Sequence, residues 1–342
     1  VQTCALPICA FIGNFDFLGF KDVSTESEDG IPPMLFAIFQ MMFAIITPAL
    51  ITGAFAERFK FSTYLVFLVL WITLVYAPVA HWVWAGDGWI LELGALDFAG
   101  GTVVHINAGV AAIVAAYLVG KRRGVDRGVE PHNVPFVILG AGILWFGWFG
   151  FNAGSGLAAD GLAVSAFLVT NTAAATAMVV WAILGNIHTG KMSGVGAATG
   201  AVAGLVAITP AAGFVGPMGA IGVGLGAGVL TFYAVRMRHI FGFDDALEVF
   251  AVHGIGGIWG AIATGIFAVG GIGLVDGDAE LLVDNVIAVL ATMAYSLVAT
   301  FIILKVLDVV PGLGLRAEEV DEDTGLDIAL HGERAYVGDG AD

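Results

Sequence analysis

Long apolar segments alternate with short polar segments along most of the chain. Each apolar segment has about 20 residues and no period-two alternation, which is typical of a helix that crosses a lipid bilayer. Only helices and closed barrels satisfy their own backbone groups in lipid, and uninterrupted apolar runs favour helices. We predict an all-α polytopic membrane bundle with nine spans: 33–56, 62–84, 98–119, 134–155, 162–187, 194–212, 217–237, 247–270 and 281–306.

The composition supports a membrane protein and argues against a soluble enzyme. Hydrophobic residues make up 58% of the chain and charged residues only 12%, with a mean hydropathy of +0.92. Soluble domains carry about twice that share of charge. The net charge of −16 is concentrated in residues 22–29, 276–284 and 318–342. Acidic loops of this kind predict no nucleic-acid partner.

The first nine residues differ in character from the rest. Cys4 and Cys9 form no metal signature and no disulfide framework, and we expect no cofactor and no metal site. Segment 1–9 has no initiator Met and no basic stretch typical of a signal peptide. We interpret it as foreign to the protein.

Basic residues follow every second span, whereas the other loops hold acidic residues, apart from Lys21 before the first span. By the positive-inside rule the basic loops and the C-terminus are cytoplasmic. The predicted organisation is an extracellular loop at 10–32, a transmembrane domain at 33–308 and a cytoplasmic tail at 309–342. The basic residues concerned are Arg58, Lys60, Lys121, Arg122, Arg123, Arg127, Lys191, Arg236, Arg238, Lys305, Arg316 and Arg334.

Two spans share a motif. Val104-His105 precedes Gly109 by the same spacing as Val252-His253 precedes Gly257. The second copy lies five spans after the first, an odd number, so the two helices point in opposite directions. This pattern indicates an inverted repeat, whose halves build a site near the middle of the membrane. The second half has five spans and the first only three, so we expect two N-terminal helices to be missing from this chain.

His105 and His253 are the strongest candidates for chemistry. A polar side chain deep in an apolar span is costly and by default marks a functional site facing the bundle interior. The alternative is a purely structural histidine that is hydrogen-bonded to a neighbouring helix. Two histidines at repeat-related positions make this alternative less favoured. If the two imidazoles meet, they can share a proton and still offer one acceptor and one donor to a small neutral solute.

Further candidates lie near the predicted outer ends of the spans. Asp97 precedes a span, where it can cap the helix start or shape the field at an outer cation site. Trp84 and Trp148 fit either an interfacial aromatic belt or a cation–π site. Ser155 adds a possible hydroxyl acceptor.

Phe43 and Phe151 occur in spans 33–56 and 134–155, respectively. They could form an apolar plug beneath such a cation site.

Several segments closely resemble the Amt/MEP/Rh ammonium transporter family, in its bacterial and archaeal Amt branch. The matches occur in order over roughly residues 34–337. They are GAFAERFKFS (53–62), GALDFAGGTVVHINAG (94–109), GWFGFNAGS (147–155), DDALEVFAVHGIGGIWG (244–260) and GLDIALHGERAY (325–336). One mild departure is Glu248, where relatives often carry aspartate.

The resemblance implies an eleven-helix protomer with an inverted five-plus-five repeat, assembled as a homotrimer with one pore in each subunit. It implies an outer ammonium site, a stacked phenylalanine gate, a pore with twin histidines, and a nearby aspartate and tryptophan. The matching residues are Trp84, Ser155 and Phe43 for the outer site, Phe43 and Phe151 for the gate, His105 and His253 for the pore, and Asp97 and Trp148 around them.

The implied function is to recruit ammonium at the outer face of the plasma membrane, remove its proton and conduct ammonia. A neutral gas channel of the Rh kind, for ammonia or carbon dioxide, is one alternative, and an ammonium sensor is another. The resemblance also implies a PII-type signal protein as a cytoplasmic partner. The tail, the loop with Arg58 and Lys60, and the loop 121–123 are the expected docking face.

Overall fold

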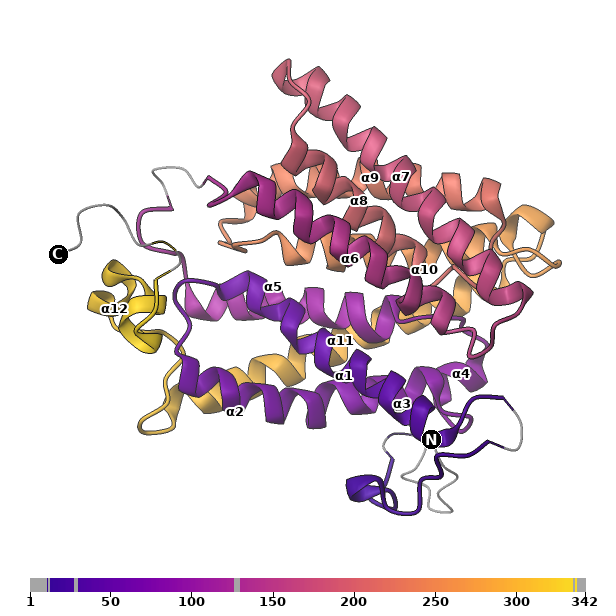
Figure 1. Cartoon of the computed structure of the whole chain (residues 1–342), viewed down its shortest axis with the longest axis horizontal. Coiled ribbons are helices and arrows are strands. Elements are labelled where there is room, and N and C mark those ends of the chain that lie inside the picture. The colour runs from indigo at the N-terminus through magenta and orange to yellow at the C-terminus, as the bar shows by residue number, and fades with distance from the viewer. Residues whose placement is uncertain (1–10, 12, 28–29, 126–129, 335, 337–342) are drawn as a thin grey trace.

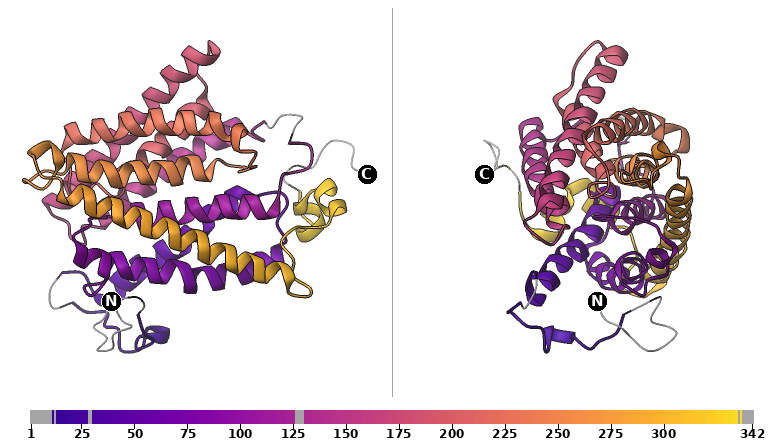
Figure 2. Two further views of the ribbon diagram at one scale, coloured as in Figure 1. Left: turned by 180° about the vertical axis from the view of Figure 1, so that it is seen from behind. Right: turned by 90° about the vertical axis from the view of Figure 1, so that its right-hand side faces the viewer.

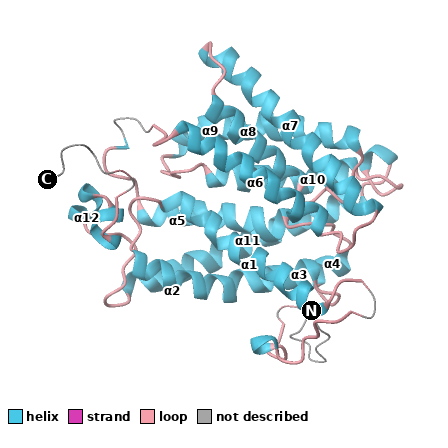
Figure 3. Cartoon of the chain, in the orientation of Figure 1, coloured by secondary structure: helices cyan, strands magenta, loops and turns pink. Residues whose placement is uncertain are grey.

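The computed structural model describes residues 11, 13–27, 30–125, 130–334 and 336. Cys4, Cys9 and Arg127 lie outside these residues. Within the described part all regular structure is helical, and the extended pairings are two isolated bridges (Figure 3). The predicted all-α membrane bundle is therefore confirmed.

The helices follow the predicted spans closely. The short helices outside the bundle are η2 (Leu18–Phe20), η7 (Leu274–Asp276), α12 (Glu319–Thr324) and η8 (Asp327–His331). The bundle contains α1 (Pro33–Phe55), α2 (Phe61–Trp71), η3 (Ile72–Tyr76), α3 (Ala77–Trp84), α4 (Trp89–Leu93), η4 (Gly101–Ile106), α5 (Asn107–Val119), α6 (Val134–Gly154), α7 (Gly161–Thr189), α8 (Gly194–Ile208), α9 (Pro217–Phe241), η6 (Phe250–Ile255), α10 (Gly256–Phe267) and α11 (Glu280–Val309).

The predicted count of nine spans is not confirmed. Among the described residues, eight helical stretches are long and apolar enough to cross a membrane. Predicted span 194–212 forms α8, which has only 15 residues. Pro210 cannot donate a backbone hydrogen bond, and the chain continues from Thr209 in turns rather than as a helix. Predicted span 247–270 is also shorter, because its helical part runs from Phe250 to Phe267.

Two groups of helices form the bundle (Figures 1 and 2). Helices α1, α2, α3 and α5 pack around one hydrophobic cluster, which includes Phe67, Trp71 and Val104. Helices α6 to α10 surround two further clusters, rich in alanine. The boundary between the groups contains η4–α5 on one side and η6–α10 on the other.

Glycines bring these two helices into close contact. A Cβ on Gly109 would lie 2.4 Å from the backbone nitrogen of Gly254, and a Cβ on Gly257 would lie 3.0 Å from both the carbonyl oxygen of Gly101 and the Cβ of His105. The contacts therefore run in opposite order along the two helices, which makes the helices antiparallel. Each glycine comes four residues after a histidine. The repeated motif thus serves as a reciprocal crossing point that sets the two histidines against each other.

Helix α11 ties the two groups together. The Asn285 amide donates to the carbonyl of Leu96 and to that of Ala261. Further along, the Ser296 hydroxyl donates to the Asn107 carbonyl at 2.9 Å. Buried polar groups need such partners, particularly in lipid, where water cannot supply them. These bonds fix α11 across the boundary.

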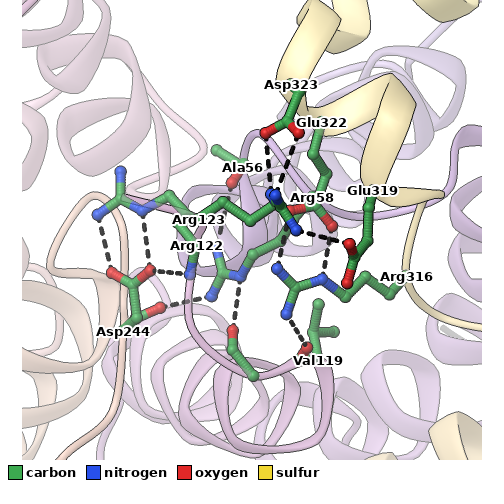
Figure 4. A network of polar contacts seen from close by, with 11 residues as sticks. Ala56, Arg58, Val119, Arg122, Arg123, Asp244, Arg316, Glu319, Glu322 and Asp323 are labelled. Atoms are coloured by element: carbon green, nitrogen blue, oxygen red, sulfur yellow. Dashed lines mark hydrogen bonds and ion pairs between the residues drawn. The ribbon is translucent and has the colours of Figure 1, made fainter. Parts of the chain in front are cut away.

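At the end of the bundle with the basic loops, Arg58 and Arg122 are buried in a polar network (Figure 4). Arg58 donates to the backbone carbonyls of Gly120 and Asp244, at 2.7 and 2.6 Å. Arg122 makes two side-chain hydrogen bonds to Asp244, at 2.8 and 2.9 Å. Burial tends to raise the pKa of the Asp244 carboxyl, but the bonds from Arg122 outweigh it and leave that pKa below its ordinary value. Arg58 and Arg122 therefore hold loops together and are not available on the expected docking face.

The C-terminal segment crosses this same end. Lys60 donates its backbone N–H to Leu315. Arg123 pairs with Glu319 and Asp323 of α12, both at 2.8 Å, and Arg316 holds Glu322 (Figure 4). The acidic helix α12 thus lies against the basic loops rather than extending away from them.

Candidate functional site

A cavity of about 530 Å³ opens at the other end of the bundle. Phe43 of α1, Trp84 of α3 and Ser155 after α6 all line it. These three residues were predicted to share an outer site. Phe43 and Ser155 are more than 110 positions apart in the sequence, and the fold brings all three to one cavity. Gln40 also lines this cavity, although the sequence reasoning missed it. The signal for Gln40 in the sequence was a polar amide side chain inside the apolar span 33–56.

Hydrogen bonds fix the polar side chains at the cavity wall. The indole N–H of Trp84 donates to the Asp97 carbonyl at 2.9 Å, which sets the orientation of the ring. The Ser155 hydroxyl donates to the Phe151 carbonyl at 2.9 Å. Since its one proton is used there, the serine oxygen faces other groups as an acceptor. The cavity therefore combines an aromatic face with a hydroxyl acceptor.

Phe43 and Phe151 lie next to this wall. Phe43 is 5.4 Å from Trp84 and 4.7 Å from Phe151, between ring centroids. The two phenyl rings meet edge to face at 66°, whereas the resemblance implied a stacked pair. The ring quadrupole favours edge-to-face over face-to-face contact, which explains the difference. Phe151 in turn is nearly parallel to His105, with centroids 5.9 Å apart.

His105 and His253 lie side by side in the interior. Their Nδ1 atoms are 3.2 Å apart, and their exposed fractions are 1% and 7%. Neither ring is turned outward. The predicted meeting of the two imidazoles is therefore present in the structure.

Thr209 determines which nitrogen of His105 carries the proton. Its hydroxyl donates to the Leu205 carbonyl, so its oxygen can only accept from Trp148 at 2.9 Å and from His105 Nε2 at 3.3 Å. His105 is then protonated at Nε2, and its Nδ1 accepts from His253 Nδ1–H. This leaves His253 Nε2 as the acceptor of the pair.

Trp148 is 2% exposed and stacks on His105 at 5.4 Å, so it is no belt residue. The sequence reasoning did not identify Thr209. Its only signal in the sequence was a hydroxyl residue next to Pro210, near the end of a predicted span.

Asp97 caps the start of the helix that carries His105. Its carboxylate accepts from the backbone N–H groups of Gly100, Gly101 and Thr102, at 2.8, 2.6 and 2.7 Å, and from the Thr102 hydroxyl. This is the capping interpretation of the sequence. With both oxygens engaged, the carboxylate stabilises the helix start.

Asp245 has the matching place in the second half. Its carboxylate accepts from the backbone N–H of Phe250, at the start of the helix that carries His253, at 2.7 Å. Each aspartate precedes its histidine by eight residues. The sequence reasoning did not use this spacing, which would have identified Asp245 as a second helix-start residue.

Replacing Asp97 with Ala should destabilise the protein by about 3 kcal/mol, because several backbone N–H groups lose a charged acceptor at once. The measurement is the thermal unfolding midpoint in detergent. Asp160→Ala is the matched control, since Asp160 caps α7 on an exposed loop through Leu162 and Ala163. Its expected effect is about 1 kcal/mol. Equal midpoints for D97A and wild type would contradict the capping role.

The arrangement defines a class of protein. Its elements are apolar helices long enough to cross a membrane, a cavity open at one end, and a buried histidine pair behind two phenyl rings. Within the described residues, no group of three His, Cys, Asp or Glu side chains is placed to hold a metal. This is a multi-pass membrane protein built to pass a small solute.

The chain belongs to the ammonium transporter family. The family model "Ammonium Transporter Family" matches residues 5–336. The ammonium transporter of Bacillus subtilis is 49% identical over 340 residues, covering 96% of this chain and 83% of that protein. Ammonium transporter Amt1 of Archaeoglobus fulgidus is 47% identical over 335 residues, with the same coverages. The predicted family is confirmed, and its members are named as transporters rather than enzymes.

Solved structures agree with this assignment. Mep2 of Saccharomyces cerevisiae has a TM-score of 0.86 and 36% identity, covering 92% of this chain and 75% of that chain. A structure described as a sensor Amt protein has a TM-score of 0.85 and 33% identity, covering 94% of this chain and 82% of that chain.

Proposed function

We propose that this protein transports ammonium by recruiting the cation in the outer cavity, removing its proton and passing ammonia along the histidine pair. One observation carries the proposal. Adjacent rings lead from Trp84 at the cavity through Phe43 and Phe151 to His105 and His253. Family membership supports ammonium as the solute.

The cavity suits a small cation. A cation over a tryptophan face is attracted by the ring quadrupole, by about 2 kcal/mol when water is excluded. The Ser155 oxygen can accept a hydrogen bond from ammonium. Phe43 adds a second ring beside Trp84. Together they would concentrate ammonium at the pore entrance.

Beyond the cavity, charge becomes costly. The phenyl rings of Phe43 and Phe151 offer a cation no hydrogen bond, and a charge at mid-membrane costs several kcal/mol. Ammonia is neutral and avoids this cost. His253 Nε2 can accept from ammonia, and the His105 ring bounds the same passage. Ammonium resembles potassium in size, so removing the proton gives a selectivity that a simple hole would lack.

We further propose the orientation and partners that the sequence suggested. The protein would lie in the cell membrane as a homotrimer, with loop 10–32 outside, domain 33–308 in the bilayer and tail 309–342 in the cytoplasm. A PII-type protein would meet the tail and the exposed Lys121, since Arg58 and Arg122 are buried. Pull-down with a PII protein from the same organism tests this partner.

An ammonium sensor is the second candidate. The likeness to the structure described as a sensor Amt protein supports it. The same outer site would then bind ammonium while a partner reads the bound state. A neutral gas channel is a weaker alternative, because an aromatic and hydroxyl mouth for a cation is unnecessary for a gas.

Trp84→Leu should raise the half-saturating methylammonium concentration about thirtyfold, because about 2 kcal/mol of cation–π attraction is lost. Uptake into proteoliposomes that hold the full chain measures it. The matched control is Trp89→Leu, at the same end of the bundle but packed on Trp82 and away from the cavity lining. Unchanged half-saturation in W84L would remove Trp84 from the outer site, and no uptake by the wild type would overturn transport itself.

A further inference from the structure

We propose that Asn107 is a positioning residue for the histidine pair, because its side-chain amide holds the wide helical turn that carries His105. This inference rests on the proposed function, in which that pair conducts ammonia. It assigns a role to a buried polar side chain that neither the outer cavity nor the pore described above uses.

His105 lies in a turn that is wider than an α-helical turn. In the π-helical segment η4, the backbone N–H of His105 donates to the Gly100 carbonyl at 3.1 Å, five residues back, whereas an α-helix bonds four residues back. Segment η6, which contains His253, is π-helical as well. Such turns are rare in proteins, and many of those known lie at functional sites. Both histidines of the pair therefore project from wide turns.

The width of the turn decides where the imidazole points. A π-helical turn contains more residues than an α-helical turn, so a turn that relaxes toward α-helical bonding rotates its side chains about the helix axis. His105 has little room for such a rotation, because its Nδ1 lies only 3.2 Å from that of His253 and must stay within reach of it. Conduction along the pair thus requires a turn of fixed width.

Asn107 lies where the wide turn ends and α5 begins. In an α-helix its backbone N–H would donate to the Val103 carbonyl, but here it is directed to the carbonyls of Thr102 and Val104. The Asn107 side chain takes over the missing bond, since its Nδ2 donates to the Val103 carbonyl at 3.3 Å. The amide therefore compensates for a backbone bond that the wide turn removes.

A second wide turn shows the same kind of compensation. In η3, which is also π-helical, the Leu74 carbonyl accepts from the Tyr295 hydroxyl of α11 at 2.7 Å. In both turns a side chain from outside the turn donates to one of its carbonyls. In the second half of the repeat, Ile255 occupies the place that corresponds to Asn107, so the inference concerns the His105 turn alone.

The burial of Asn107 indicates that its amide is present for this bond. The residue is 0% exposed, and its Oδ1 is buried with no protein partner among the described residues. A buried polar group lowers stability unless it is hydrogen-bonded, so a position that served only for packing would be apolar. The Ser296 hydroxyl holds the backbone carbonyl of Asn107 from α11, at 2.9 Å. The residue is thus fixed in place with its donor directed at the wide turn.

The experiment compares Asn107→Val with Asn107→Thr, because the two new side chains are nearly equal in size and only threonine has a donor. Buried threonine hydroxyls elsewhere in this chain donate to the carbonyl four residues back, as Thr231 and Thr264 do. N107T should therefore restore the bond to Val103, and N107V should lose it. Maximal methylammonium uptake into proteoliposomes, per folded protein, should fall about fivefold or more in N107V and stay within about twofold of wild type in N107T. Half-saturation should be unchanged in both, because the outer cavity keeps its lining.

The contact between the histidines gives a readout that a packing role would not change. The nitrogen NMR resonance of His105 Nδ1, assigned by comparison with H253A, should lose its hydrogen-bonded shift in N107V and keep it in N107T. Thr264→Val is the matched control, since it removes a buried bond from a hydroxyl to a carbonyl in α10, outside the wide turns. It should keep both the uptake and the resonance of the wild type.

Two results would overturn the inference while leaving transport intact: wild-type maximal uptake by N107V, even with a lower unfolding midpoint, or an N107T variant as impaired as N107V. If N107V does not fold, Asn107→Ala and Asn107→Ser repeat the comparison with smaller side chains, of which only serine has a donor. Absence of saturable uptake by the wild type would instead overturn the proposed function.

Discussion

His253→Ala is expected to lower ammonia conduction at least about tenfold while leaving the helices assembled. The variant removes the acceptor nitrogen of the pair and leaves Nδ1 of His105, 3.2 Å away, without its donor. An unpaired polar group in an apolar passage costs about 1–3 kcal/mol, and each 1.4 kcal/mol is a factor of ten. Methylammonium uptake by proteoliposomes measures the loss.

A thermal unfolding scan on the same sample separates conduction from stability. A histidine with only a packing role would lower the unfolding midpoint and keep selective uptake. His188→Ala is the matched control. His188 is an exposed histidine near the C-terminal end of α7, where it contacts Tyr233, and it is not part of the pair. Normal, ammonia-selective uptake by H253A would remove the histidine pair from the transport path.

Gly109→Ala is expected to destabilise the bundle by about 3 kcal/mol or more, although it adds a single methyl group. The new Cβ would lie 2.4 and 2.5 Å from the backbone nitrogen and Cα of Gly254, and backbone cannot rotate away as a flexible side chain can. The helices that carry His105 and His253 would have to separate, so uptake should fall together with the unfolding midpoint.

Gly150→Ala is the matched control for this variant. Gly150 is also a helical glycine, but a Cβ there meets no atom within 4 Å. Helix propensity alone should then make this control neutral or more stable by up to about 1 kcal/mol. If G109A were as stable and as active as G150A, the close crossing at Gly109 would not be what holds the histidines together.

Much of the site could be predicted before the fold was known. His105 and His253 are polar residues in apolar spans with the same Val-His-x-x-x-Gly pattern, and lipid makes such residues conspicuous. The resemblance then associated Trp84, Phe43 and Ser155 with one site. The span limits also followed from hydropathy, except that α8 and the η6–α10 stretch are shorter than their predicted spans.

Other parts had little local signal. Thr209 fixes the tautomer of His105 only because α8 brings its hydroxyl between Trp148 and the imidazole. Arg58 and Arg122 belonged to a predicted basic docking face, yet both are buried against backbone carbonyls and Asp244. Sequence position cannot distinguish a basic residue that faces water from one that ties two loops together.

The sequence by itself determined that this protein is an apolar helical bundle of the membrane, its family and its two candidate histidines, because the bilayer imposes length and polarity on every span. The tertiary structure alone decided which side chains meet: the Nδ1 contact of the histidines and the edge-to-face phenyl pair. These depend on helix crossings such as the one at Gly109, where backbones from distant segments come into van der Waals contact. Hydropathy does not encode such distances.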